Sequence, residues 1–384
     1  FLLQRMADRF DIWPSTSADT WWINPNQYVG VMLLPSGQAL VVDPKVPVRN
    51  VFQMFAVAHG LTGVFRDELA RLEDINDLIE LVVMHFVDLV RDRIRRGLYR
   101  DYVEREDNLS TVRGRIVIQQ QVQQNAILQH RMYCRFTEFT HDIPENQIIR
   151  QVLHLLSLRV AFPVLRLDLQ RLDATLGEVT PTNMTIHDLD RMYYHRLNDD
   201  YQPIHRLCRL FLELLSLEHQ SGETELRAFL IDMNALFEKY VAKALEGTTP
   251  VGGKVLDQEH RHLDVGKTIS IKPDLVLRYA LADILIADTK YKDVDNKDVR
   301  ESDLYQMTAY CLSQGVDDGL LIYPASGLNT DKHYLIRNSG IRIRAITIDL
   351  GMPPDEFARR STEIGDRIWN IAIIAAAEVQ MLPA

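Results

Sequence analysis

The stretch Ile271-Lys-Pro-Asp274-Leu-Val-Leu-Arg-Tyr279, followed closely by Ile284-Leu-Ile-Ala-Asp288-Thr-Lys290, decides the fold of this chain. Both runs, 268–279 and 284–291, are rich in the Ile, Leu, Val and Tyr residues that favour strands, and a short connection joins them. The sequence therefore predicts a β-hairpin. Because side chains two apart on a strand share a face, we expect Asp288 and Lys290 to point the same way.

The hairpin brings two carboxylates, Asp274 and Asp288, together with the ammonium of Lys290. Buried carboxylates repel each other unless a cation neutralises them, and Mg²⁺ is usually held by one or two carboxylates plus substrate phosphate. The pattern thus predicts Mg²⁺, or Mn²⁺ in its place, with Lys290 beside a scissile phosphate. A turn-forming Pro-Asp and a surface Asp/Lys pair would give the same pattern, so that alternative stays open.

Hydrophobic spacing on either side of the hairpin predicts the elements that enclose it. Their order, with the hairpin included, is αβββαββα. We expect a helix at 226–245, a strand at 251–258, a helix at 302–314, strands at 319–323 and 341–350, and a closing helix at 355–379.

This order, with Pro273-Asp274 and Asp288-Thr-Lys290, resembles the core of the PD-(D/E)xK nucleases, and Gln306-Met-Thr-Ala-Tyr310 matches the QxxxY motif of their RecB-like branch. Over most of its length the chain is more closely similar to the McrC family, the nuclease subunits of McrBC-type modification-dependent restriction systems. The matching segments are Val46-Pro-Val-Arg-Asn50, Val112-Arg-Gly-Arg-Ile116, Asp232-Met-Asn-Ala-Leu-Phe-Glu238, Asp288-Thr-Lys-Tyr-Lys292 and Leu304-Tyr-Gln-Met307.

The resemblance implies an α/β fold, α+β overall, in which a restriction-endonuclease-like core has a mixed sheet flanked by helices. It also implies that Asp274, Asp288 and Lys290 form the cleavage site and that the two acids bind the metal. Gln306 and Tyr310 lie one helical turn apart, so both can face the hairpin and support the site or the DNA. Ordinary amphipathic packing of their helix is the competing interpretation.

Glu238 is a further candidate metal ligand, because cores of this family often carry an acid on their first helix. Asn234 shares that face of the helix. A solvated Glu238 beside Lys239 is equally consistent with the sequence.

By resemblance, we expect a Mg²⁺-dependent endodeoxyribonuclease that cuts double-stranded modified DNA, of the methylcytosine type, together with a McrB-like AAA+ GTPase hexamer. No P-loop is visible in the sequence, so GTP would bind only to that partner. Two alternatives stay open: a stand-alone PD-(D/E)xK repair or recombination nuclease, and a non-catalytic activator of a partner NTPase. An idle site has no physical reason to keep mutually repelling carboxylates beside a lysine, which disfavours the activator.

The overall charge is unlike that of a protein that grips duplex DNA alone. Lys and Arg number 43 against 53 Asp and Glu, a net charge of −10, whereas phosphate binding depends on excess basic residues. We therefore expect a partner to hold the DNA. The arginine-rich run 91–115 is either a phosphate-facing or partner-facing surface, or a solvated helix end with local ion pairs.

Cysteine usage and hydropathy bear on the compartment. The three cysteines are far apart and odd in number, which disfavours a disulfide framework or a zinc site. The most apolar run, 78–90, is interrupted by Glu80, His85 and Asp88, so no membrane segment is expected. The sequence therefore predicts a cytoplasmic protein.

Three consecutive regions are predicted. Residues 1–47 form a small β module with strands at 19–24, 28–34 and 38–43, the last two joined by a turn at Pro35-Ser-Gly37. Trp21 and Trp22 would face opposite sides of a strand, leaving one near the surface. By resemblance, this module is expected to contact the AAA+ ring.

Residues 48–222 are predicted to form a mainly helical connecting region, with helices at 50–58, 75–98, 145–160 and 203–219. A strand at 111–118 interrupts it as a basic prong. Arg113 and Arg115 would share a face there and touch nucleotide or DNA phosphate, or else brace against Glu138 or Asp142. Residues 223–384 form the nuclease domain.

Overall fold

The structure of the chain is a computed structural model that describes residues 10–16, 20–33, 39–60, 75–127, 130–160, 162–216, 227–291, 299–325, 331–351 and 354–381. The chain forms two compact units, which are described separately below. Unit 1 joins Phe1–Ile79 to Ala228–Ala384, and unit 2 is Glu80–Arg227.

The centre of unit 1 is a six-stranded mixed sheet with the strand order β15-β16-β14-β13-β12-β9. β13 and β14, and β14 and β16, run parallel, while the other neighbours are antiparallel. The bounds are β9 Gly253–Asp257, β12 Leu275–Tyr279, β13 Ala282–Thr289, β14 Asp318–Ala325, β15 Asp331–Leu335 and β16 Arg342–Asp349. The predicted hairpin is therefore the β12–β13 pair at the middle of the sheet.

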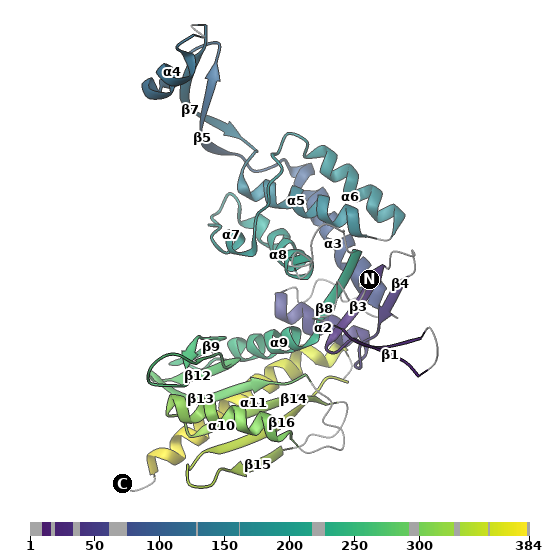
Figure 1. The fold of residues 1–384 in the computed structure, drawn as a ribbon, viewed down its shortest axis with the longest axis vertical. Coiled ribbons are helices and arrows are strands. Elements are labelled where there is room, and N and C mark those ends of the chain that lie inside the picture. The colour runs from purple at the N-terminus through teal and green to yellow at the C-terminus, as the bar shows by residue number, and fades with distance from the viewer. Residues whose placement is uncertain are drawn as a thin grey trace. The chain divides into compact units, whose positions relative to one another are not determined.

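Helices cover both faces of this sheet (Figure 1). α10 (Glu301–Gln314) lies against β13, β14 and β16, and its Met307, Tyr310 and Cys311 share a buried cluster with Ile286 of β13. α9 (Met233–Gly247) and α11 (Pro354–Met381) pack together and both contact β13. The predicted fold class is confirmed: the core is α/β, α+β overall, and its helices flank a mixed sheet.

The remaining strands of unit 1 form small sheets. β1 (Asp11–Pro14) pairs with β2 (Trp21–Asn24), and β10 (Arg261–His262) pairs with β11 (Ser270–Ile271). A three-stranded sheet has the order β4-β3-β8, with β4 at Ala39–Val42, β3 at Tyr28–Leu33 and β8 at Arg227–Asp232. α2 (Val48–His59) packs against α9 and α11.

Unit 2 combines helices with a three-stranded sheet of order β5-β7-β6. β5 (Asp101–Leu109) and β7 (Met132–Thr140) pair over their whole length as a long antiparallel ribbon, and β6 is only Arg115–Ile116. The helices are α3 (Ile75–Arg96, whose first residues belong to unit 1), α4 (Ile118–Asn125), α5 (Pro144–Arg159), α6 (Pro163–Thr175), α7 (Ile186–Asp190) and α8 (Gln202–Ser216), with a 3₁₀ turn, η2, at Asp199–Tyr201.

Several predicted elements differ from the structure. The helix expected at 226–245 is wrong for its first part, because 227–232 is strand β8 and the helix starts only after Asp232, whose side chain caps it. The strand expected at 268–279 is split into β11 and β12 by Lys272–Asp274. Only Arg115–Ile116 of the strand expected at 111–118 is extended, and α4 begins at Ile118. The turn expected at 35–37 lies outside the described residues.

The two compact units do not coincide with the three consecutive regions predicted from the sequence. β8, from the C-terminal part of the chain, pairs with β3 from the N-terminal part, and α2 packs on α9 and α11. Residues before 80 and after 227 therefore share one core. Among the described residues, no helix is both long and apolar enough to cross a membrane.

Candidate functional site

The β12–β13 register brings the predicted acids together. Leu275 pairs with Ala287 in this antiparallel hairpin, so Asp274, one residue earlier, stands opposite Asp288. Asp288 and Lys290 follow Ile286 at steps of two, which puts them on the sheet face that α10 covers. Neighbouring strands thus direct two carboxylates and one ammonium to one place.

Asp288 is the most deeply buried acid of this group, with 2 % of its surface exposed. Its Oδ2 atom lies 2.5 Å from Nζ of Lys290 and accepts no well-aligned hydrogen bond from the described residues. Burial, and then the charge of Asp274, raise the pKa of Asp288 to about 7, although Lys290 opposes the shift. Burial lowers the pKa of Lys290, but the carboxylates of Asp288 and Asp274 outweigh it and raise that pKa above its usual value.

Asp274 is fixed by the strand opposite. Its Oδ2 accepts hydrogen bonds from the backbone N of Thr289 at 2.7 Å and from Thr289 Oγ1 at 2.9 Å. Thr289 lies between Asp288 and Lys290 in the chain, so these bonds lock Asp274 to the segment that carries the other two groups. Within the part of the chain that the structure describes, its Oδ1 atom accepts no hydrogen bond.

Glu238 of α9 lies beside the same pair of strands. Its Oε1 accepts a 2.5 Å hydrogen bond from Nε2 of Gln258, the residue just after β9. Burial, followed by the charge of Asp274, raises the pKa of Glu238 to about 7. The structure therefore brings Glu238 close to Asp274 and does not leave it as a freely solvated side chain beside Lys239.

Gln306 and Tyr310 of α10 are bonded to each other. Nε2 of Gln306 donates to the hydroxyl of Tyr310 over 2.9 Å, and Tyr310 is buried with Met307 in the cluster below the sheet. Burial, and then Asp288, raise the pKa of Tyr310, which indicates that its ring stands near the acids. The structure therefore fits both interpretations of Gln306 and Tyr310, because Tyr310 packs in the buried face of the helix and also lies near the acids of the hairpin.

Asp303 is a polar group of this site that sequence reasoning missed. It is buried at 4 % exposure in the first turn of α10, and Tyr323 of β14 donates a 3.0 Å hydrogen bond to its Oδ2. Its charge acts on both Asp288 and Lys290. Its position four residues before Met307, on the buried face of the helix, is the sequence feature that could have indicated it.

The donors present suit a hard divalent cation. Within the described residues, no group of three or more His, Cys, Asp or Glu side chains is arranged to hold a metal ion. Mg²⁺ needs only one or two carboxylates when water and substrate phosphate complete its shell, and Asp274 and Asp288 are two such donors. The buried Oδ2 of Asp288, with its single close ammonium, is an oxygen that a cation would satisfy.

The predicted basic prong is braced in unit 2. Nη1 of Arg113 lies 3.3 Å from Oε1 of Glu138, and its guanidinium stands 4.3 Å above the ring of Phe136. Of the two interpretations of Arg113, bracing against Glu138 is the one the contacts support. Four other arginines in 91–115 are ion-paired: Arg91 with Asp88 and Asp168, Arg93 with Asp200, Arg95 with Asp92, and Arg105 with Glu138 and Asp142.

The N-terminal tryptophans are both exposed, contrary to the expectation that only one would be. Trp21 is 53 % and Trp22 60 % exposed, because β1 and β2 form a sheet of two strands with no third strand in the described residues. Trp22 pairs across the sheet with Trp13.

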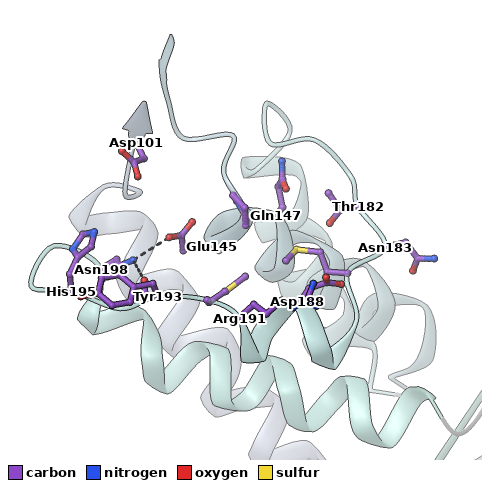
Figure 2. A pocket seen from close by; sticks show the side chains of 13 residues that line it. Asp101, Glu145, Gln147, Thr182, Asn183, Asp188, Arg191, Tyr193, His195 and Asn198 are labelled. Carbon is purple, nitrogen blue, oxygen red and sulfur yellow. Dashed lines mark hydrogen bonds between the residues drawn. The ribbon is translucent and has the colours of Figure 1, made fainter. Parts of the chain in front are cut away.

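Unit 2 also contains a pocket of about 760 Å³ (Figure 2). None of the residues predicted for cleavage lines it. Its wall is organised by the buried Asn198, whose Nδ2 donates to Oε1 of Glu145 and to the backbone oxygen of Tyr193, both at 3.1 Å. The lining residues are Asp101, Pro144, Glu145, Gln147, Thr182, Asn183, Met184, Asp188, Arg191, Met192, Tyr193, His195 and Asn198.

Comparisons with solved structures found chains similar to this one. A chain of the refined half-complex from a tetradecameric assembly of Thermococcus gammatolerans McrB AAA+ hexamers with bound McrC matches with a TM-score of 0.56 and 20 % identity, over 90 % of this chain and 84 % of that one. A chain of the Thermococcus gammatolerans McrBC complex matches with a TM-score of 0.42 and 21 % identity, over 64 % and 77 %. The first match shows a shared fold.

A search of curated proteins found no match. A family model described as McrBC 5-methylcytosine restriction system component matches residues 23–324, most of the chain. This chain therefore belongs to the family of McrBC 5-methylcytosine restriction system components.

Proposed function

We propose that this chain is the Mg²⁺-dependent endodeoxyribonuclease subunit of its restriction system. One observation carries the proposal: Asp274 stands opposite Asp288 on the β12–β13 hairpin, and the ammonium of Lys290 lies 2.5 Å from Asp288. Carboxylates that repel each other in a buried place, beside a cationic side chain, are arranged for metal-assisted phosphodiester hydrolysis. Mn²⁺ would serve in place of Mg²⁺.

In the proposed reaction, Asp274 and Asp288 would hold the metal, and Glu238 would add an acid from α9. The bound ion would lower the pKa of a water molecule and neutralise charge on the phosphate. Lys290 orients the attacking water and offsets the negative charge that develops on the phosphate oxygens. Gln306 and Tyr310, joined by their hydrogen bond, support this arrangement from α10.

We propose that the chain acts with a McrB-like AAA+ GTPase hexamer on double-stranded modified DNA. The net charge of −10 supports a partner that holds the DNA, and family membership supports a partner of the McrB type. GTP would be bound by that partner. The exposed Trp21 and Trp22 of β2 support the N-terminal sheets of unit 1 as the ring contact, because exposed aromatic surface often marks a protein interface. Such a complex would work in the cytoplasm.

The test is a plasmid cleavage assay with and without the co-encoded GTPase, GTP and Mg²⁺, on methylated and unmethylated DNA. We expect cutting only when all are present and the DNA is methylated, and no cutting by Asp288→Ala at unchanged GTPase stimulation. Asp331→Asn, at an exposed position on β15 of the same sheet, is the matched control and should cut normally.

Three outcomes would overturn parts of the proposal. Cutting by Asp288→Ala would refute the site. Cleavage of unmethylated DNA without the GTPase would indicate a stand-alone nuclease. Stimulation of GTP hydrolysis by a wild-type chain that never cuts would indicate a non-catalytic activator.

A further inference from the structure

Gln258, the residue after β9, has an unusual backbone conformation. Its φ is +47°, in the left-handed region that non-glycine residues seldom occupy. This conformation is strained for an L-residue, and such strain persists only where surrounding contacts hold it. The backbone N of Gln258 donates a 2.8 Å hydrogen bond to the carbonyl of Asp274, which extends the β9–β12 pairing by one residue just before the chain turns.

The Gln258 side chain links two charged groups. Its Nε2 donates to Oε1 of Glu238 over 2.5 Å, and its Oε1 accepts from Nζ of Lys272 over 2.6 Å. A carboxylate can only accept and an ammonium can only donate, so the amide has one possible orientation. It therefore joins α9, the end of β9 and the Lys272–Asp274 segment.

The choice of an amide matters for a metal site. A lysine or arginine at this position would neutralise Glu238 by an ion pair, and the carboxylate would lose its attraction for a cation. The amide of Gln258 gives one hydrogen bond without neutralising the charge, and it keeps the ammonium of Lys272 on its far side. Glu238 is thus fixed beside Asp274 by a neutral partner.

We infer that Gln258 is a positioning residue of the cleavage site, whose strained backbone and bridging amide hold Glu238 beside Asp274, one of the two proposed metal ligands. The inference rests on the proposed function and adds a residue that acts only through Glu238. The exposure of Gln258 argues against a role in the core, because its side chain buries little apolar surface. A purely structural demand for a left-handed residue would be met better by glycine.

The test compares Gln258→Gly with Lys267→Gly. Lys267 has a similar φ of +57° in another exposed turn of unit 1, and it has no part in the site. Both substitutions relieve backbone strain, so both variants of the full chain should be at least as resistant to urea as the wild type. Only Gln258→Gly should weaken Mn²⁺ binding, measured calorimetrically without DNA, by about tenfold or more, as loss of an outer-shell partner does.

A double substitution separates positioning from a direct role. Gln258→Gly added to Glu238→Gln should cause no further loss of Mn²⁺ affinity, nor of the Mg²⁺ dependence of cleavage with the GTPase, because Gln258 acts through Glu238. Asp288→Ala is measured in parallel. If the wild type binds Mn²⁺, Asp288→Ala does not, and Gln258→Gly binds as the wild type does, the inference about Gln258 is wrong while the proposed function stands. If Asp288→Ala binds and cuts normally, the proposed function itself fails.

Discussion

The hydroxyl of Tyr323 donates a 3.0 Å hydrogen bond to Oδ2 of Asp303 in the buried layer between β14 and α10. Both residues are almost fully buried, at 3 % and 4 % exposure. Tyr323 follows Ile322, whose carbonyl accepts the backbone N of Lys290 at 2.8 Å. The bond therefore ties the helix that carries Gln306 and Tyr310 to the strand beside Lys290.

Tyr323→Phe should lower the free energy of unfolding by about 2 kcal/mol, because it leaves a buried carboxylate without one of its donors. Tyr334→Phe is the matched control: Tyr334 packs against the same cluster, but its hydroxyl makes no hydrogen bond to the described residues. Its cost should stay below about 0.5 kcal/mol. Urea denaturation of both variants measures the difference, and equal costs would contradict a stabilising role for the hydroxyl.

The charges of Asp288 and Lys290 should depend on each other for the stability of the chain. Lys290→Met leaves Asp288 buried with no compensating ammonium, so it should destabilise the chain by about 3 kcal/mol. Asp288→Asn together with Lys290→Met should recover most of that loss, because neither charge then remains in the interior.

Denaturation midpoints in metal-free buffer measure this cycle. Lys254→Met, at an exposed position on β9, is the control and should change stability little. A Lys290→Met variant as stable as the wild type would show that Asp288 does not depend on its neighbour.

Gly114 should tolerate no side chain. Its φ is +66°, and a Cβ there would stand 2.3 Å from the carbonyl oxygen of Arg135 on β7. Gly114→Ala should therefore push the Arg113–Arg115 turn off the ribbon and separate Arg113 from Phe136. Gly97, also in unit 2, has a φ of +89° but nothing within 4 Å of its Cβ position, so Gly97→Ala carries the backbone strain alone.

Hydrogen exchange separates these two effects. Peptides spanning β6 and β7 should exchange markedly faster in Gly114→Ala than in the wild type, while Gly97→Ala should leave them unchanged. Equal exchange in both variants would mean that the close approach to Arg135 does not hold the turn in place.

The sequence predicted the elements whose burial leaves a clear pattern. β13 reads as the continuous apolar run Ile284 to Ala287 because helices cover both faces of its sheet, and α10 carries Met307, Tyr310 and Cys311 at helical spacing. Asp274, Asp288 and Lys290 could be placed together because hairpin geometry is local. The metal and phosphate chemistry was predicted from the charges of these three residues, and resemblance to known nucleases added the roles of Gln306, Tyr310 and Glu238.

Other elements leave no such pattern. Phe229 and Leu230 of β8 fit the helical spacing of α9 as well as they fit a strand, and the partner strand β3 is far away in the chain. No residue of the ribbon strand β5, Asp101–Leu109, is buried, so its sequence has no apolar face that would indicate a strand. Asp303 looked like any acid in a first helical turn, where the helix dipole favours it.

His205 should make unit 2 sensitive to acid. Burial lowers its pKa from 6.5 to about 4, against the opposing hydrogen bond from its ring to the carbonyl of Glu145. Because a carbonyl only accepts, Nε2 carries the proton in that 3.0 Å bond, and Nδ1 accepts the hydroxyl of Tyr194 at 2.8 Å. The folded chain therefore holds His205 neutral.

Between pH 6.5 and pH 4 the unfolded chain binds a proton at His205 that the folded chain does not, so stability falls as the pH is lowered. The full loss from this group is about 3 kcal/mol, reached below the folded pKa and absent above the unfolded one. Tyr194 and Tyr201, whose rings pack against His205, have raised pKa values and do not titrate in that window.

Urea denaturation of the wild type and of His205→Asn at pH 7, 6, 5 and 4 tests this account. Asn cannot gain a proton, so the difference in unfolding free energy between the two chains should shrink by about 3 kcal/mol as the pH falls. His130→Asn, at an exposed position, should run parallel to the wild type throughout. A difference between wild type and His205→Asn that is constant with pH would mean that His205 has the same pKa in the folded and the unfolded chain, so that burial does not hold the ring neutral.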